Sequence, residues 1–274
     1  MEYRFERGRL PLLVSIPHAG TDIPDDIAGR MTPCALARAD TDWHLPDLYA
    51  FAREMGASLL AGRWSRYVID LNRPPEDTNL YPGLDTTGLC PVDTFGRERL
   101  YREGAEPGVA DIQQRLQRYW RPYHERLRTE LARLCAEHGR VVLWEAHSIA
   151  SIVPRLFDGR LPDLSFGTND GKSCSLQLEG AMIQVAQAQG RYSFVFNGRF
   201  KGGYITRHYG DPARGVHAIQ LEMCRHLYMD EGPPFAYRPE RAALVQPLLW
   251  QLLQDAQKWA DSGAHIAQMA KDER

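Results

Sequence analysis

The amino-acid sequence predicts a single-domain α/β protein with a mixed, mainly parallel central sheet flanked by helices. Segments typical of strands alternate with segments typical of helices along the 274 residues, which is the pattern of a parallel sheet covered on both faces. The chain is long enough for one sizeable hydrophobic core, and neither an internal repeat nor a low-complexity stretch divides it. We therefore expect residues 1–274 to form one domain.

The first half of the chain is expected to contain three strands and one helix. The strands are predicted at 12–16 (LLVSI), 57–61 (ASLLA) and 66–71 (RYVIDL). Between the first two strands, apolar residues recur at helical spacing from Leu45 to Met55, and glycine follows at a position where helices commonly end. Residues 72–108 are rich in Pro, Gly, Asp and Thr and predict a long excursion of loop.

The second half is expected to open with a long helix over 111–138. Its apolar face consists of Ile112, Leu116, Tyr119, Tyr123, Leu127, Leu131 and Leu134. Pro122 should kink this helix or split it in two, because proline has no N–H group to donate to the preceding turn. Strands are predicted at 141–145, 192–196 and 216–222, a loop-rich region at 151–174, and helices at 175–189 and 239–270.

Chemically demanding side chains stand where four of the predicted strands end. His18 follows the first strand, Asn72 and Arg73 follow RYVIDL, His147 follows VVLWE, and Glu222 ends VHAIQLE. In open α/β sheets, functional groups gather where loops leave the carboxyl ends of the strands. Each residue alone suits a structural role, but two imidazoles, a guanidinium and a carboxylate at one edge of a sheet predict a functional site.

Two histidines on separate strands suit a catalytic zinc ion, which typically takes three protein ligands and leaves one position open for water. A third ligand is then needed, and a carboxylate is the expected type. The candidates are Asp22, Asp40 and Asp42, with His44 as a weaker alternative. Sequence spacing alone does not decide among them.

Composition and charge argue against several classes of partner. The formal net charge is −2, so no basic field indicates a nucleic acid or an anionic membrane. The five cysteines include no C-x-x-C pair, which argues against a disulfide scaffold or a thiolate zinc site and favours a reducing compartment. The N-terminal segment has no apolar signal core, and no segment approaches the length of a membrane span, so we expect a cytoplasmic protein.

Two other classes of protein are weaker alternatives. The segment GTNDGKS resembles a phosphate-binding loop, but only three residues separate Gly167 from Gly171, where that pattern requires four. A metal-free module that binds anions would keep the arginines without catalysis. The joint presence of His18, His147 and Glu222 favours an enzyme instead.

Several segments resemble the N-formylglutamate amidohydrolase (deformylase) family of histidine degradation. They are SIPHAG, DTDWHLPDLYAFA, SRYVIDLNRP, AHS, LFDGRLPD, GTNDG, NGRFKGGYITRHYG and GVHAIQLE, in this order along most of the chain. That family is related in fold and site to zinc carboxypeptidases and aspartoacylases. The resemblance implies a phosphorylase/hydrolase-like α/β fold and one divalent metal ion, expected to be zinc.

The resemblance also implies roles for residues of the metal site. His18 and His147 match the metal-binding histidines, and Asp42, within T-D-W, becomes the preferred third ligand. Glu222 takes the place of the carboxypeptidase-type general base. The carboxypeptidase pattern H-x-x-E is absent after His18, and Glu145 stands where an aspartate is expected two residues before the metal histidine.

The implied substrate carries two carboxylates and a formamide. Arginine suits such a ligand, because its planar guanidinium binds a carboxylate through two parallel hydrogen bonds. Asn72 and Arg73 match the D-x-N-R segment that binds a substrate carboxylate in aspartoacylase-like enzymes. In the glycine-rich segment NGRFKGGYITRHYG the resemblance favours Arg207 over Arg199 as a substrate contact, and Arg155 is a further candidate.

The implied reaction is the hydrolysis of N-formyl-L-glutamate to L-glutamate and formate. Zinc would polarise the formyl carbonyl and activate water, and Glu222 would act as the general base. The alternative is the same metallohydrolase chemistry on another N-acyl amino acid, because a sequence does not reveal the volume of a pocket. In both cases the expected partner is a small dicarboxylate N-acyl amino acid.

Overall fold

The computed structural model describes the backbone of residues 1–272 and the side chains of residues 1–262. Its centre is a seven-stranded sheet with the strand order β1-β3-β2-β4-β7-β5-β6. The strands are β1 (Tyr3–Glu6), β2 (Leu12–Ile16), β3 (Ser58–Gly62), β4 (Val141–Ile149), β5 (Leu164–Gly167), β6 (Phe194–Phe196) and β7 (Val216–Cys224). The four central strands β3, β2, β4 and β7 are parallel, whereas β1 and β5 pair antiparallel with β3 and β7. This arrangement confirms the predicted single-domain α/β fold with a mixed, mainly parallel sheet.

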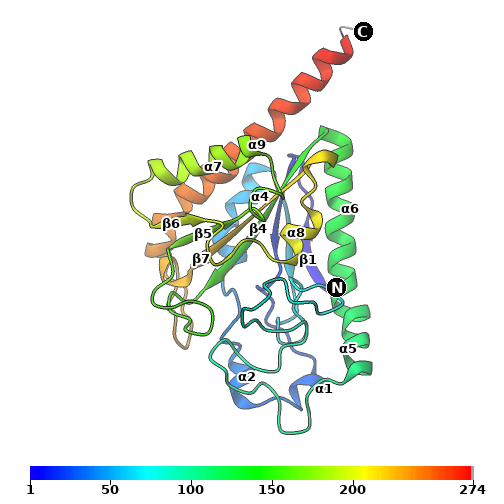
Figure 1. Ribbon diagram of the computed structural model, residues 1–274, viewed down its shortest axis with the longest axis vertical. Coiled ribbons are helices and arrows are strands. Elements are labelled where there is room, and N and C mark those ends of the chain that lie inside the picture. Colours follow the sequence, from blue (N-terminus) through cyan, green and yellow to red (C-terminus); the bar gives the residue numbers. More distant parts are fainter. Residues whose placement is uncertain (273–274) are drawn as a thin grey trace.

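Helices cover both faces of the sheet (Figure 1). One face packs against α3 (Leu45–Leu48), α4 (Phe51–Met55), α7 (Leu176–Ala188) and α9 (Pro239–Asp272), and the other against α5 (Val109–Arg115), α6 (Arg121–His138) and α8 (Tyr204–Tyr209). Side chains alternate along a strand, so Leu12 and Val14 of β2 join the first core cluster and Leu13 joins the second. Shorter helices are α1 (Asp25–Ala28), α2 (Pro33–Ala37) and the 3-10 turns Pro212–Arg214 and Arg225–Leu227. No helix within residues 1–272 combines the length and the apolar character that crossing a membrane requires.

The long helix predicted over 111–138 forms with one irregularity. A π-helical turn, Leu116–Trp120, joins α5 to α6 directly before Pro122. Proline has no N–H group for the regular ladder, and a widened π turn is a common way in which a helix absorbs such a defect. The sequence predicts that Pro122 kinks or splits the helix, and the structure shows instead a local change of helix type before Pro122.

The segment 66–71, predicted as a strand, is a succession of turns. The N–H group of Val68 donates to the carbonyl of Ser65 at 2.8 Å, and that of Asp70 donates to the carbonyl of Leu89 at 2.7 Å. The apolar side chains of the segment are nevertheless buried in the core. Its apolar pattern therefore indicated burial correctly and the backbone conformation wrongly.

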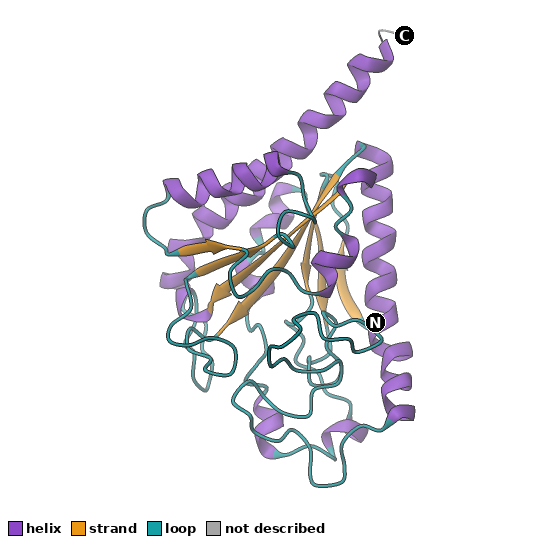
Figure 2. Cartoon of the chain, viewed as in Figure 1, coloured by secondary structure: helices purple, strands orange, loops and turns teal. Residues whose placement is uncertain are grey.

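Other differences concern the ends of elements. The helix predicted up to Gly56 is divided into α3 and α4, and the loop-rich region 151–174 contains β5. The strands β4 and β7 continue beyond their predicted ends, so His147 and Glu222 lie within strands. Figure 2 shows that loops gather at one end of the sheet. Residues 17–24, which leave the carboxyl end of β2, belong to these loops.

Candidate metal centre

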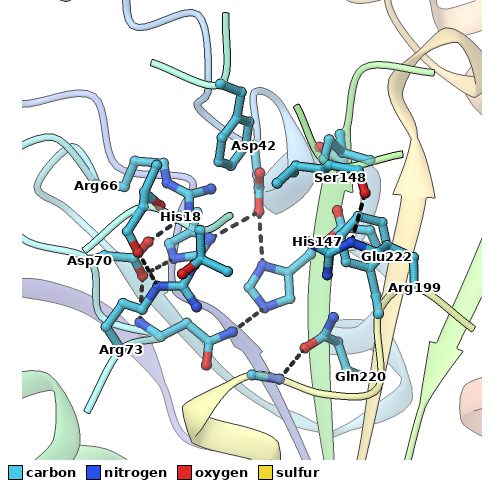
Figure 3. A pocket seen from close by; sticks show the side chains of 18 of the residues that line it. His18, Asp42, Arg66, Asp70, Arg73, His147, Ser148, Arg199, Gln220 and Glu222 are labelled. Carbon is cyan, nitrogen blue, oxygen red and sulfur yellow. Dashed lines mark hydrogen bonds and ion pairs between the residues drawn. The ribbon is translucent and has the colours of Figure 1, made fainter. Parts of the chain in front are cut away.

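The two histidines predicted at strand ends are neighbours in the structure (Figure 3). His18 follows β2 after Pro17, and His147 belongs to β4, which pairs with β2. Their ring centroids are 4.8 Å apart. Asp42 lies between α2 and α3, where its N–H group donates to the carbonyl oxygen of His18 at 3.0 Å. This backbone hydrogen bond fixes the carboxylate beside the two imidazoles.

Asp42 faces one nitrogen of each imidazole. Its Oδ2 atom lies 3.1 Å from Nδ1 of His147 and 3.7 Å from Nδ1 of His18. One donor atom from each of the three residues lies within 4.8 Å of the others, and all three side chains are buried. Two imidazole nitrogens and one carboxylate oxygen match the three protein ligands of a catalytic zinc site.

A second carboxylate contacts the other nitrogen of each imidazole. His18 Nε2 lies 2.7 Å from Asp70 Oδ1, and His147 Nε2 lies 2.7 Å from Glu145 Oε1. An Nε2–H group that donates to these carboxylates leaves the Nδ1 lone pair directed at the cluster. Metal-binding histidines commonly have such a partner, which orients the ring and raises its basicity. The residues present therefore fit a divalent metal ion.

The electrostatics of the cluster favour a positive charge at its centre. Burial raises the pKa of Asp42, but the hydrogen bond with His147 and the neighbouring positive charges hold it below its ordinary value. Burial likewise acts against ionised Asp70, yet the charge of His18 and other nearby cations keeps its pKa well below its ordinary value. Burial lowers the pKa of His147, but the carboxylates of Glu145 and Asp42 raise it well above its ordinary value. Such an environment compensates a bound cation.

Glu222 stands directly across from His147 in the pairing of β4 with β7. Its side chain lines the same pocket as the clustered residues. Burial raises the pKa of Glu222 to about 8, although the charge of His147 acts in the opposite direction. A carboxylate that titrates near neutral pH can accept and return a proton, as general acid–base catalysis requires.

A pocket lies beside this cluster and contains three arginines. Its lining includes His18, Asp42, His147, Glu222, Arg66, Asp70, Asn72, Arg73, Tyr81, Thr87, Ser148, Arg199 and Gln220. Arg66 forms an ion pair with Asp70 at 2.6 Å. Arg73 donates its Nε–H to the carbonyl oxygen of Thr87 at 2.9 Å. The pocket thus presents positive charge beside a cluster of metal-type ligands.

The structure brings six of the predicted residues together, namely His18, Asp42, Asn72, Arg73, His147 and Glu222. Asn72 reaches the metal cluster, with its Nδ2 atom 3.1 Å from His147 Nε2. Its Oδ1 atom accepts the N–H of Ile205 at 2.8 Å. The segment that carries Asn72 and Arg73 is therefore attached to α8 and lies against the histidine.

Two arginines predicted as substrate contacts are placed elsewhere. Arg155 does not line the pocket, because its guanidinium pairs with Asp85 and Asp93 at 2.9 Å each. Arg207 is also absent from the lining and donates its Nε–H to the carbonyl of Gly202 at 2.8 Å. Arg199, the less favoured residue of the same segment, lines the pocket instead.

The alternative third ligands lie outside the cluster. The side chain of Asp22 is about half exposed and pairs with a surface arginine. Asp40 accepts the N–H of Phe95 at 2.8 Å, and Nε2 of His44 lies 2.8 Å from the carbonyl oxygen of Phe235. Among these candidates, Asp42 alone has an oxygen beside both histidines.

Sequence reasoning missed Arg66 and Asp70 and left the role of Glu145 open. Their local signals were present: Asp70 is the aspartate of D-x-N-R, Arg66 precedes it by four residues, and Glu145 precedes His147 by two. In a strand, residues two apart share a face, so the contact between Glu145 and His147 follows directly from the continuation of β4.

Comparison with known proteins identifies close relatives. A family model described as N-formylglutamate amidohydrolase matches residues 10–229. The N-formylglutamate deformylase of Pseudomonas aeruginosa is 51% identical over 255 residues, which cover 93% of this chain and 96% of that protein. The N-formylglutamate deformylase of Pseudomonas putida is 50% identical, with coverage of 93% and 95%.

Solved structures share the architecture. The crystal structure of N-formylglutamate amidohydrolase from Ralstonia eutropha JMP134 has a TM-score of 0.79 and 28% identity, and the similarity covers 95% of this chain and 97% of that one. The gene product Atu2144 from Agrobacterium tumefaciens has a TM-score of 0.70, 20% identity and coverage of 93% and 94%. The second similarity concerns the fold alone.

Proposed function

The chain belongs to the N-formylglutamate amidohydrolase family, and we propose that it is a zinc-dependent enzyme that hydrolyses N-formyl-L-glutamate to L-glutamate and formate. Relatives named N-formylglutamate deformylase support the substrate, because they are 50–51% identical over 93% of this chain. We further infer that the whole chain acts as one catalytic domain, since one sheet supplies the strands that carry the site.

One observation carries the proposal. The buried donor cluster of His18, Asp42 and His147 shares its pocket with Glu222 and with arginines. This combination suits the hydrolysis of an amide that carries carboxylates. A metal ion in the cluster would polarise the amide carbonyl, Glu222 would accept a proton from water, and the arginines would bind the carboxylates. A purely structural cluster of histidines and carboxylates would not need Arg73 and Arg199, which line the same pocket and form no ion pair within the described residues.

The residues of the cluster would hold the metal ion, and their neighbours would orient them. His18, Asp42 and His147 supply the ligands, while Asp70 and Glu145 fix the two imidazoles. When bound, zinc supplies polarisation of the formyl carbonyl and a lower pKa for water. Every other task falls to side chains of the pocket.

Glu222 acts as the base and Arg66 and Arg73 supply positive charge. Glu222 accepts a proton from the attacking water and passes it to the leaving nitrogen, so that formate and the free amine result. Arg66 lines the same pocket and is oriented by its ion pair with Asp70, so it adds a permanent cation beside the cluster. Arg73 binds a carboxylate of the substrate through its terminal nitrogens, because its Nε–H is already donated to Thr87.

Metal removal and a substrate panel test this function. The purified protein is assayed for released amine on N-formyl-L-glutamate and N-acetyl-L-glutamate, before and after treatment with a chelator. We expect turnover of the formyl substrate, loss of activity with chelator, and recovery on addition of zinc. Faster turnover of the acetyl substrate would favour an aspartoacylase-like enzyme, and full activity at undetectable metal content would contradict the proposal.

The ligand set is tested on the same preparation. His18→Ala and His147→Ala should lose bound metal and activity together, as measured by elemental analysis and the amine assay. The control is Glu137→Gln, which removes the charge of an exposed side chain at the end of α6 and should retain both the bound metal and the activity. A variant of either histidine with full metal occupancy would remove that residue from the ligand set.

A further inference from the structure

Two arginines of the pocket have guanidinium groups without a carboxylate partner. Arg73 donates its Nε–H to the carbonyl oxygen of Thr87, and Arg199 donates its Nε–H to the carbonyl oxygen of Leu156 at 2.7 Å. Neither guanidinium forms an ion pair with any carboxylate of the described chain. Each Nε–H bond fixes the direction of the guanidinium and leaves its terminal nitrogens available to a ligand.

The positive charges of Arg73 and Arg199 are unfavourable when no anion is bound beside them. Burial lowers the pKa of both arginines, and the positive charge of Arg73 further lowers the pKa of Arg199. Partly buried cations that repel each other are stabilised when anionic groups bind between them. Two such cations indicate a ligand with two negative groups.

Arg73 and Arg199 approach the pocket from different parts of the fold. Arg73 follows Asn72, which contacts His147 beside the metal cluster. Arg199 follows β6, the edge strand of the sheet. In Figure 3, Arg73 lies on the side of Asp70 and Arg199 on the side of Glu222. The two guanidiniums are therefore placed to bind separate groups of one ligand.

Tyr81 supports Arg199 from the long loop. Its ring centroid lies 5.2 Å from the Cζ atom of Arg199, a cation–π distance. The hydroxyl of Tyr81 donates to the carbonyl of Gly202 at 2.9 Å and accepts the N–H of Lys201 at 3.1 Å. Arg199 is thus held by a ring that is itself anchored to the backbone.

We propose that Arg199 binds the side-chain carboxylate of the substrate and thereby sets the preference for glutamate over amino acids with neutral side chains. This inference rests on the proposed function. The α-carboxylate is next to the scissile formamide and matches Arg73, which adjoins the metal cluster. Arg199 follows the edge strand β6 and lies on the other side of the pocket from Arg73, so we assign it the second carboxylate, that of the substrate side chain.

The test compares two substrates that differ only in the distal group, N-formyl-L-glutamate and N-formyl-L-glutamine. Arg199→Met should lower kcat/KM for the glutamate substrate by roughly 10- to 150-fold, the range for a hydrogen bond to a charged group. It should leave kcat/KM for the glutamine substrate almost unchanged, so that the preference disappears. Arg191→Met, an exposed arginine that precedes β6, is the matched control and should retain the preference of the unmodified protein.

The outcomes separate this inference from the proposed function. An equal loss on both substrates, or no loss on either, overturns the role of Arg199 and leaves the deformylase function intact. Failure of the unmodified protein to hydrolyse either substrate overturns both. If Arg199→Met does not fold, Arg199→Lys carries the test: a higher KM for the glutamate substrate alone supports the inference, and an unchanged KM overturns it.

Discussion

At the scale of residues, each clustered histidine is fixed by carboxylates at both ring nitrogens. Asp42 faces Nδ1 of both rings, while Asp70 and Glu145 contact the two Nε2 atoms. Such outer carboxylates decide the tautomer and the orientation of a metal ligand. Glu145 is additionally fixed, because its Oε2 accepts the N–H of Thr206 at 3.0 Å.

Removal of one outer carboxylate should weaken metal binding without removing a ligand. We expect Glu145→Gln to lower zinc affinity by about 10- to 100-fold, the usual effect of losing such a partner. Competition with a chromophoric chelator measures this affinity, and far-UV circular dichroism verifies the fold. Unchanged affinity would mean that Glu145 serves only to attach α8 to the sheet.

The sequence predicted the two histidines and left the outer shell open for a physical reason. His18 and His147 follow buried apolar runs, and this position is visible locally. The partner of His18 lies 52 residues away in Asp70, so their contact depends on how the turns at 66–71 pack. Asp42 became the preferred third ligand only through the family resemblance, since spacing does not report its backbone bond to His18.

At the scale of elements, α8 begins against the segment that carries Asn72. Gly203 precedes α8, and a Cβ atom there would lie 2.3 Å from Nδ2 of Asn72. The N–H group of Gly203 donates to Oε1 of Gln220 at 2.8 Å, and this hydrogen bond holds the backbone close to Asn72. Glycine is required here because the chain passes directly over a side chain of the site.

We therefore expect Gly203→Ala to displace Asn72 from His147 and to lower kcat/KM at least tenfold or so, comparable with other losses of second-sphere contacts. The matched control is Gly180→Ala in the middle of α7, where nothing lies within 4 Å of an added Cβ atom. Alanine there should raise the free energy of unfolding by up to about 1 kcal/mol, its advantage in helix propensity. Equal activity in the two variants would contradict the proposed contact.

The predictions of helices and strands were correct where the apolar pattern was long. They were wrong where a buried apolar segment does not have the extended backbone that its composition suggests. The regular spacing over 111–138 identified α5 and α6, and LLVSI identified β2. The segment 66–71 has the composition of a buried strand, yet the buried ion pair of Arg66 with Asp70 joins residues four apart, a spacing that an extended strand does not allow. The turn depends on contacts with distant residues, such as the hydrogen bond from the N–H of Asp70 to the carbonyl of Leu89, and a local pattern does not contain them.

At the scale of the whole molecule, a buried histidine couples stability to pH. His124 of α6 stacks on Trp120 with ring centroids 3.6 Å apart, and Nε2 lies 2.8 Å from the carbonyl oxygen of Leu71. Burial lowers its pKa to about 3 from the ordinary value of 6.5. The folded protein therefore keeps this ring neutral at pH values where the unfolded chain protonates it.

A lowered histidine pKa means that stability falls as the pH drops below about 6.5 and continues to fall until the folded-state pKa is reached. Between pH 6 and pH 4, His124 should account for a loss of about 1.4 kcal/mol in unfolding free energy per pH unit. His124→Gln removes this contribution, so urea titrations at several pH values should show a shallower decline for the variant. If the unfolding free energies of the variant and the unmodified protein fall in parallel with pH, the pKa of His124 is not lowered in the folded protein.

The overall architecture was predictable because alternating strands and helices admit few arrangements. The alternation of strand and helix signals predicted the α/β class and a parallel centre. It did not predict the strand order, because β4 and β7 pair although β5, α7, β6 and α8 lie between them in the chain. That pairing places Glu222 beside His147. The catalytic proposal therefore depends on a feature that local patterns do not contain.

The most direct test of the account is the behaviour of Glu222→Gln, which keeps the size of the side chain and removes its basicity. The variant should fold, retain its metal and bind N-formyl-L-glutamate, while hydrolysis slows at least roughly a hundredfold, the lower end of general-base effects. Measured together, bound metal, substrate affinity and kcat distinguish a base from a ligand. Loss of metal would make Glu222 a ligand, and unchanged turnover would contradict the mechanism that we assign to this pocket.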